Sequence, residues 1–229
     1  MENQESKTVS PGEAGLVIVA TFFVFLFLSV LIQLVFGDAL ALIVGELLIL
    51  IVPLIYLLIK RINIISYVKI DLNPKYIAFG LVCAGLLLLL NIAVSNALFY
   101  IFGESTAVEQ SNALLTELSM TPSGLASVAT SLALAGICEE FAFRGFLQNS
   151  IFKSLSASKS PRVSFVVAVV ISALVFGLFH FDPQFVYTIA AFTTGLALGY
   201  IYHRWNYTTS ATAHAGMNLI VLALLLLGI

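Results

Sequence analysis

Residues 14–36 read AGLVIVATFFVFLFLSVLIQLVF, a stretch without a single charged side chain. A helix needs about 20 mostly apolar residues to cross the roughly 30 Å hydrocarbon core of a bilayer, so this stretch predicts a membrane-spanning helix. The whole chain of 229 residues contains 60% hydrophobic and 10% charged residues, and its mean hydropathy is +1.07. Soluble domains carry about 25% charged residues, so the composition excludes an ordinary soluble enzyme.

Six further stretches repeat this pattern along the chain. We therefore expect an all-α fold, a polytopic transmembrane bundle with about seven spanning helices, near residues 14–36, 39–59, 76–102, 123–148, 163–181, 184–203 and 208–228. The chain then divides into an N-terminal tail (1–13), three helices with their loops (14–122) and a four-helix core that holds the candidate site (123–229). The tail is acidic and lacks the basic start of a cleaved signal peptide, so we treat the first helix as part of the structure.

Basic residues gather in every second connection between the expected helices. They are Lys60, Arg61, Lys69 and Lys75, then Lys153, Lys159 and Arg162, and finally Arg204. Short cytoplasmic loops collect Lys and Arg, so the pattern predicts a multi-pass membrane protein with a cytoplasmic N-terminus, in the cell membrane or, in a eukaryote, the endoplasmic reticulum. The net charge of -2 offers no basic stripe for phosphates, so we expect no nucleic-acid partner.

Three ionisable residues lie close together in the fourth expected helix. The segment GICEEFAFRGFLQ (136–148) contains Glu139, Glu140 and Arg144. Residues four apart share a helix face, so we expect an ion pair between Glu140 and Arg144. Glu139 points elsewhere, because neighbouring helix positions diverge by about 100°. Charges inside a bilayer are costly and usually functional, although a purely structural charge cluster near the helix end is the competing interpretation.

Two histidines and an asparagine lie on other helices of the same half. Phe176 and His180 are four apart near the end of the fifth helix, and His214 and Asn218 are four apart near the start of the seventh. A single histidine on an apolar face is more often a satisfied buried residue than a catalyst. Together, however, a carboxylate, two imidazoles and an amide supply the base and the oxyanion donors that amide hydrolysis needs.

These three motifs are EExxxR (139–144), FxxxH (176–180) and HxxxN (214–218), and in this order they resemble the CAAX protease and bacteriocin-processing enzyme family. The resemblance covers roughly residues 123–228 and implies an intramembrane endopeptidase of the CAAX prenyl endopeptidase type. It implies a substrate that is a membrane-associated protein or peptide, possibly prenylated. It also implies that Glu139 and His180 activate water, that His214 and Asn218 stabilise the oxyanion, and that Glu140, Arg144 and Phe176 support them. On this interpretation no cofactor is needed.

Other chemistry and another class of protein remain open. His180, His214 and a glutamate could form a zinc site with two histidines and one carboxylate, although the HExxH pattern is absent. A cysteine protease built on Cys138 is less favoured, because most buried cysteines act as small hydrophobic residues. The chain could also be a non-catalytic bacteriocin-immunity protein or a transporter, whose intramembrane polar groups would include Glu46, Asn91 and Asn96. His203, next to Arg204, fits an interfacial anchor better than a site residue.

The depth of the histidines decides whether they can meet. If the last three helices each cross the membrane fully, His180 and His214 lie on opposite sides of it. The shared-water mechanism therefore requires residues 180–183 to lie below the surface in a water-filled cavity, because broken backbone at membrane depth needs protein or water to satisfy it. A separation of Glu139 and His180 beyond about 12 Å would exclude that mechanism, since a base must reach its water.

Overall fold

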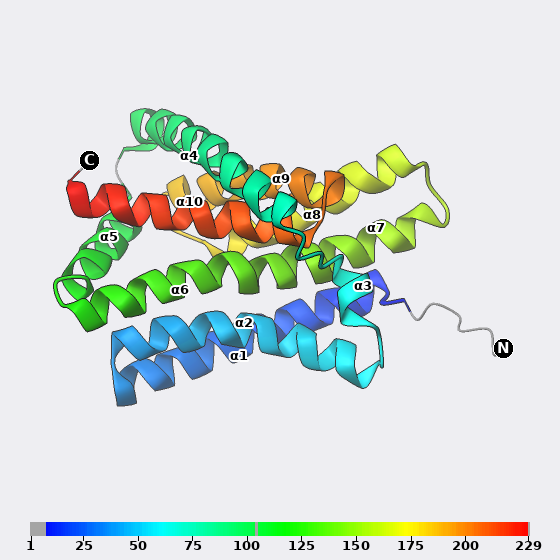
Figure 1. The fold of residues 1–229 in the computed structure, drawn as a ribbon, viewed down its shortest axis with the longest axis horizontal. Coiled ribbons are helices and arrows are strands. Elements are labelled where there is room, and N and C mark those ends of the chain that lie inside the picture. The colour runs from blue at the N-terminus through cyan, green and yellow to red at the C-terminus, as the bar shows by residue number, and fades with distance from the viewer. Residues whose placement is uncertain (1–7, 104, 229) are drawn as a thin grey trace.

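The computed structural model describes residues 8–103 and 105–228, so the first half of the predicted tail lies outside the described residues. Over these ranges the chain is helical and contains no β-strand (Figure 1). The helices are α1 (Pro11–Phe36), α2 (Asp38–Ile59), α3 (Ile64–Val68), α4 (Pro74–Phe102), α5 (Thr106–Leu118), α6 (Pro122–Glu140), the π-helix η1 (Phe141–Gln148), α7 (Asn149–Ser156), α8 (Pro161–Phe179), α9 (Val186–Arg204) and α10 (Tyr207–Leu227). The predicted all-α polytopic fold is confirmed.

Six segments of the described chain are long and apolar enough to cross a membrane. They are α1, α2, α4, the continuous helix from Pro122 to Ser156, α8 and α10. The seventh predicted span, 184–203, does form helix α9, but α9 does not meet the same criteria. Its threonines, tyrosines, glycines and terminal His203 and Arg204 lower its hydropathy. Many of its side chains are buried among other helices, so α9 depends on protein contacts more than on lipid.

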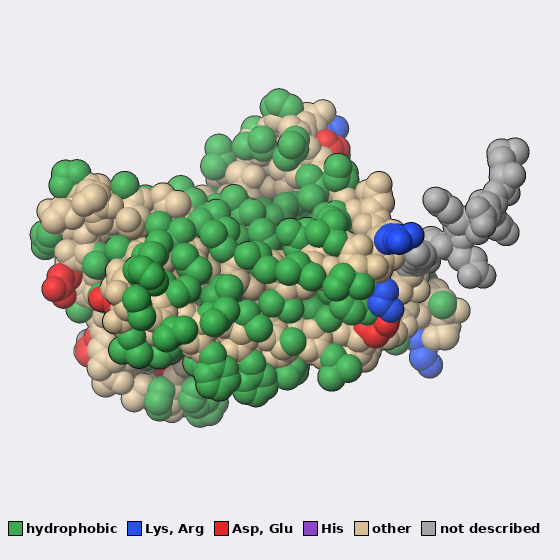
Figure 2. Space-filling model, turned by 90° about the horizontal axis from the view of Figure 1, so that it is seen from below, with side chains coloured by type: hydrophobic (Ala, Val, Ile, Leu, Met, Phe, Trp, Pro, Cys, Tyr) green, Lys and Arg blue, Asp and Glu red, His purple; other side chains and the backbone are tan. Residues whose placement is uncertain are grey.

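The surface agrees with a membrane-embedded bundle. Figure 2 shows a face on which hydrophobic side chains cover the middle, while Lys and Arg side chains gather at one end. Leu16, Phe27 and Leu34 on α1 are among the many large apolar side chains left exposed. Exposed apolar area of this extent marks a membrane or protein interface. The orientation of this bundle in the membrane stays a prediction.

The two short helices α3 and α5 lie within segments expected to be polar connections. Each begins at a capping side chain, because Asn63 accepts a hydrogen bond from the Ser66 N–H and Ser105 accepts one from the Val108 N–H. Such caps satisfy backbone donors at a helix start and stabilise even short helices. Both helices lack the length of a spanning segment, which is why a hydropathy search does not find them.

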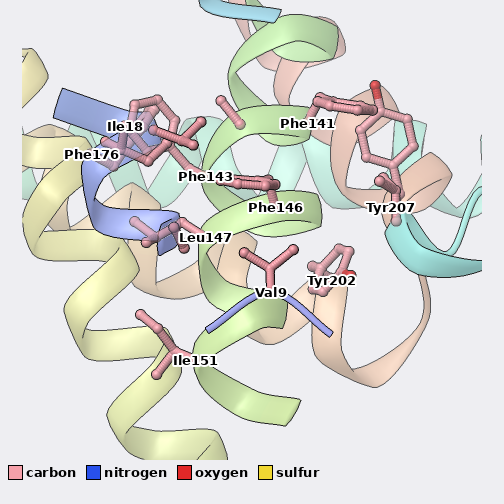
Figure 3. Packing of buried hydrophobic residues seen from close by; sticks show 14 of the residues in the cluster. Val9, Ile18, Phe141, Phe143, Phe146, Leu147, Ile151, Phe176, Tyr202 and Tyr207 are labelled. Carbon is pink, nitrogen blue, oxygen red and sulfur yellow. The ribbon is translucent and has the colours of Figure 1, made fainter. Parts of the chain in front are cut away.

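The centre of the bundle is packed around the π-helix. All eight residues of η1 are buried, and Phe141, Phe143 and Phe146 belong to the largest apolar cluster. Figure 3 shows these rings between side chains of α1, α8, α9 and α10. A π-helix is rare and is found frequently at functional sites. Here it follows directly on Glu139 and Glu140.

One long helix sets the depth of the histidines. It shows why His180 and His214 do not lie at opposite ends of the bundle, as they would if each of the last three helices crossed the membrane fully. α6, η1 and α7 form a continuous helix of 35 residues, about 50 Å long at 1.5 Å per residue, which exceeds the roughly 30 Å membrane core. Glu139 lies at its midpoint. α8 starts beyond the far end of this helix and returns alongside it for 19 residues, about 28 Å. Its end, at His180, is therefore level with Glu139 rather than at the opposite membrane surface.

Candidate active site

Glu139 lies between the two imidazole rings. Its Oε1 atom is 3.8 Å from Nε2 of His180, and its Oε2 atom is 3.7 Å from Nε2 of His214. The first distance is far below the 12 Å limit that the shared-water mechanism sets. Both distances slightly exceed a direct hydrogen bond, and polar groups at this separation are suitably placed to share a water molecule.

Glu140 and Arg144 form the predicted ion pair. Nη1 of Arg144 lies 2.7 Å from Oε1 of Glu140, and both side chains are completely buried. The guanidinium also lies over the ring of Phe176, 4.3 Å from its centroid, which is a cation–π contact. A second guanidinium nitrogen donates to the carbonyl oxygen of Gly195 at 3.3 Å. The pair thus joins the α6 and η1 segment to α8 and α9.

The other residues around Glu140 orient His214. The Nδ1 atom of His214 lies 3.2 Å from Oε1 of Glu140, and the hydroxyl of Ser210 donates to Oε2 of the same carboxylate. Because a carboxylate only accepts, Nδ1 of His214 carries a proton and Nε2 is directed at Glu139. A carboxylate that holds an imidazole in this way fixes its tautomer and its orientation.

His180 is oriented by the backbone of its own helix. Its Nδ1 atom lies 2.9 Å from the carbonyl oxygen of Phe176, so Nδ1 is the donor. The Nε2 atom of the neutral ring is then an acceptor and faces Glu139. The FxxxH motif therefore contributes in two ways, because the Phe176 backbone fixes His180 while the Phe176 ring lies against Arg144 and against His180, whose ring centroid is 4.6 Å away.

A buried aspartate holds the loop that follows His180. Asp182 accepts hydrogen bonds from the Ser105 hydroxyl at 2.9 Å, from the Thr188 N–H at 3.0 Å and from the Val186 N–H at 3.2 Å. Burial acts to raise the pKa of Asp182, but these hydrogen bonds to its charged form outweigh burial and lower the pKa. Within the turn Asp182 is buried, whereas Phe181 and Pro183 are exposed, and the depth of this turn in the membrane stays a prediction.

Asn218 is the predicted site residue that the structure sets apart from the cluster. Its amide Nδ2 donates to the carbonyl oxygen of Leu132 on α6, at 3.2 Å. Leu132 lies two helical turns before Glu139, and Asn218 lies one turn beyond His214. One N–H of the amide is thus used by the backbone, and the second N–H is the one left for an oxyanion.

Several residues of the site have no signature in the three motifs. Ser210 precedes His214 by four residues, so the helical spacing that links His214 to Asn218 could have revealed it. Gly136 lets α6 and α10 touch, because a Cβ atom at this position would lie 2.2 Å from the backbone nitrogen of Ala215. The role of Asp182 depends on long-range contacts with Ser105 and Thr188, and no local pattern predicts such contacts.

The fold and this cluster define a polytopic helical membrane protein with glutamates and histidines gathered inside its bundle. Residues 121–220 match the family model described as type II CAAX prenyl endopeptidase, Rce1-like. This match supports the resemblance of the chain to the CAAX protease family over the segment that holds the candidate site. The match contains all three motifs, whereas α1 to α5 lie outside it. No curated protein and no solved structure matches the chain.

Proposed function

We propose that this protein is an intramembrane endopeptidase in which Glu139 and His180 activate a water molecule against a peptide bond. The observation that carries the proposal is the position of the Glu139 carboxylate between Nε2 of His180 and Nε2 of His214, at 3.8 and 3.7 Å. The family match supports the reaction class, and prenylated CAAX-type peptides are the first substrates to test.

The reaction starts with a water molecule between Glu139 and His180. One of these groups takes a proton while the water oxygen attacks the carbonyl carbon of the bond to be cleaved. The attack places a negative charge on the carbonyl oxygen of the tetrahedral intermediate.

The second half of the reaction uses His214 and Asn218. The protonated ring of His214, held by Glu140, and the second N–H of Asn218 are the donors that we assign to the oxyanion. The proton taken from water is then delivered to the peptide nitrogen, the C–N bond breaks, and the products are a carboxylate and an amine. Glu140 and Arg144 take no part in proton transfer: Glu140 orients His214, and the ion pair with Arg144 holds α6, α8 and α9 in register.

We propose a reaction without a metal, with zinc as the alternative. In the part of the chain that the structure describes, His, Cys, Asp and Glu side chains do not form a group of three or more suited to hold a metal ion. Both nitrogens of His214 also face carboxylates. Inhibition by a chelator with recovery on adding zinc would replace this proposal by the zinc-dependent mechanism.

The test uses purified protein in lipid nanodiscs with two substrates, a prenylated CAAX peptide and an unprenylated leader-type peptide. We expect the wild type to hydrolyse the prenylated peptide and Glu139→Gln to lose about 10²- to 10⁴-fold in rate, the usual contribution of a general base. Glu117→Gln is the control, because it makes the same change on the exposed face of α5. Full activity in Glu139→Gln would reject the mechanism, and an inactive wild type on every peptide would reject the proposed function.

A further inference from the structure

A pocket of about 260 Å³ lies between α1 and α2, outside the segment that matches the family. Its lining comes from α1, α2 and one residue of α5, and comprises Phe25, Leu26, Ser29, Val30, Gln33, Asp38, Ala41, Leu42, Gly45, Glu46 and Leu114. Pockets for small molecules occupy about 300–1,000 Å³. At about 260 Å³ this pocket lies just below that range, so it has room for a small ligand or a few side chains.

The polar groups of this pocket are acidic or neutral. None of the described residues that line it is a lysine, an arginine or a histidine. At one end Asp38 accepts a hydrogen bond from the Gln33 amide at 2.7 Å. At the other end the Oε2 atom of Glu46 is buried and, among the described residues, has no hydrogen-bond partner. A buried carboxylate oxygen without a partner is costly, so Glu46 has the chemistry to bind a cationic donor.

Glu46 lies at the depth of the active site. α2 and α6 run side by side in the same direction (Figure 1), and the rings of Tyr56 and Phe146 are 5.8 Å apart. Glu46 lies ten residues before Tyr56 on α2, and Gly136 lies ten residues before Phe146 on the neighbouring helix. Glu46 is therefore opposite Gly136, which is about one helical turn from Glu139.

The glutamates at this depth do not all have a basic partner. Arg144 pairs with Glu140, whereas Glu46 and Glu139 form no ion pair with a lysine or an arginine among the described residues. The substrate can supply a further positive charge, because peptide hydrolysis releases an α-amine whose ordinary pKa of about 8 keeps it protonated at neutral pH. A carboxylate beside the released amine would pair with it in apolar surroundings.

From these observations we propose that Glu46 is the subsite for the leaving amine. Its carboxylate binds the ammonium of the fragment on the carboxyl side of the cleaved bond, and the pocket between α1 and α2 receives the apolar residues of that fragment. This inference rests on the proposed endopeptidase function. It assigns to α1 and α2 a part in substrate recognition that the three motifs do not include.

The test compares two product analogues, an apolar tripeptide with a free amine and the same tripeptide with an acetylated amine. For the wild type, we expect the free-amine peptide to inhibit hydrolysis at least about tenfold more strongly, which corresponds to one charge-assisted hydrogen bond. Glu46→Gln should reduce this preference to less than threefold, while Glu117→Gln keeps it. Equal inhibition of the wild type by both peptides would overturn the proposal, as would an unchanged preference in Glu46→Gln.

Equilibrium binding of the two tripeptides separates this inference from the proposed function. Binding is measured in nanodiscs for the wild type, Glu46→Gln and Glu139→Gln, with melting temperatures as a check of folding. We expect Glu139→Gln to retain the preference for the free amine, since Glu46 is intact. If the wild type hydrolyses no peptide yet prefers the free amine through Glu46, the proposed function fails and the subsite stands. If it hydrolyses peptides without that preference, the subsite fails alone.

Discussion

Two ion pairs of nearly equal length lie in opposite surroundings. Lys60 and Glu13, near the ends of α2 and α1, are 2.6 Å apart with side chains 41% and 36% exposed. Arg144 and Glu140, at the centre of the bundle, are 2.7 Å apart with both side chains fully buried. The Glu13 carboxylate raises the pKa of Lys60, but water and salt screen an exposed pair of this kind.

The difference shows that surroundings, rather than distance, give a charge pair its importance. Water solvates either member of the exposed pair when its partner is lost. In the buried pair, removal of one member leaves an uncompensated charge inside the protein. Glu140 also contacts Ser210 and His214, and Arg144 contacts Phe176 and Gly195. The buried pair therefore supports the site, whereas the exposed pair only joins two helix ends.

The largest effect is expected for the loss of the buried arginine. Arg144→Met leaves Glu140 as an unpaired buried carboxylate and should lower the free energy of unfolding by about 3–5 kcal/mol. Thermal unfolding in detergent micelles measures this loss of stability. The double variant Glu140→Gln with Arg144→Met should recover most of the loss, because neither charge remains. A single variant as stable as the wild type would show that burial does not distinguish the two pairs.

A methyl group between α6 and α10 should have the next largest effect. In Gly136→Ala the added carbon meets the Ala215 backbone at 2.2 Å, so the two helices must move apart. We expect a loss of about 1–3 kcal/mol in stability, as for other overpacked positions, and slower hydrolysis because His214 moves away from Glu139. Gly85→Ala on α4 is the control, since an added carbon there meets nothing within 4 Å. Equal effects of the two substitutions would contradict the close helix contact.

Asp182→Asn should have an intermediate effect that depends on pH. The folded state lowers the pKa of Asp182, so its stabilisation is complete above the ordinary value of about 3.9 and is lost as pH falls through the lower folded value. The difference in melting temperature between the wild type and Asp182→Asn should therefore be constant from pH 5 to 7 and shrink below about pH 3.9.

The same substitution should lower kcat by about 10- to 100-fold, because small displacements of a catalytic group such as His180 are costly. Asp71→Asn is the control, since Asp71 is exposed and bonds the nearby Asn73 N–H. Unchanged kcat in Asp182→Asn would show that the loop does not position His180.

The smallest effect is expected at the exposed pair. Lys60→Met removes the ion pair with Glu13 from a solvated helix end, so stability and hydrolysis rate should stay within error of the wild type. The melting temperature at low and high salt measures any remaining contribution. A loss as large as that of Arg144→Met would overturn the comparison.

The sequence predicted the helices and the clustering of the motif residues better than it predicted their depths, while the catalytic roles of these residues stay predictions. Hydropathy placed all seven long helices, and the four-residue spacing correctly paired Glu140 with Arg144. Hydropathy missed the extension of the fourth helix through α7, because residues 149–156 are polar and resemble a loop. That extension brings His180 level with Glu139. The π-helix and the acidic pocket depend on long-range packing, which no local pattern records.

The most direct test of the account is a double-mutant cycle between Glu139→Gln and His180→Ala, read as the rate of hydrolysis of the preferred peptide. If both groups act on one water molecule, each single variant loses about 10²- to 10⁴-fold and the double variant loses no more than the slower single variant. If the losses multiply, Glu139 and His180 act independently and the shared-water mechanism is wrong.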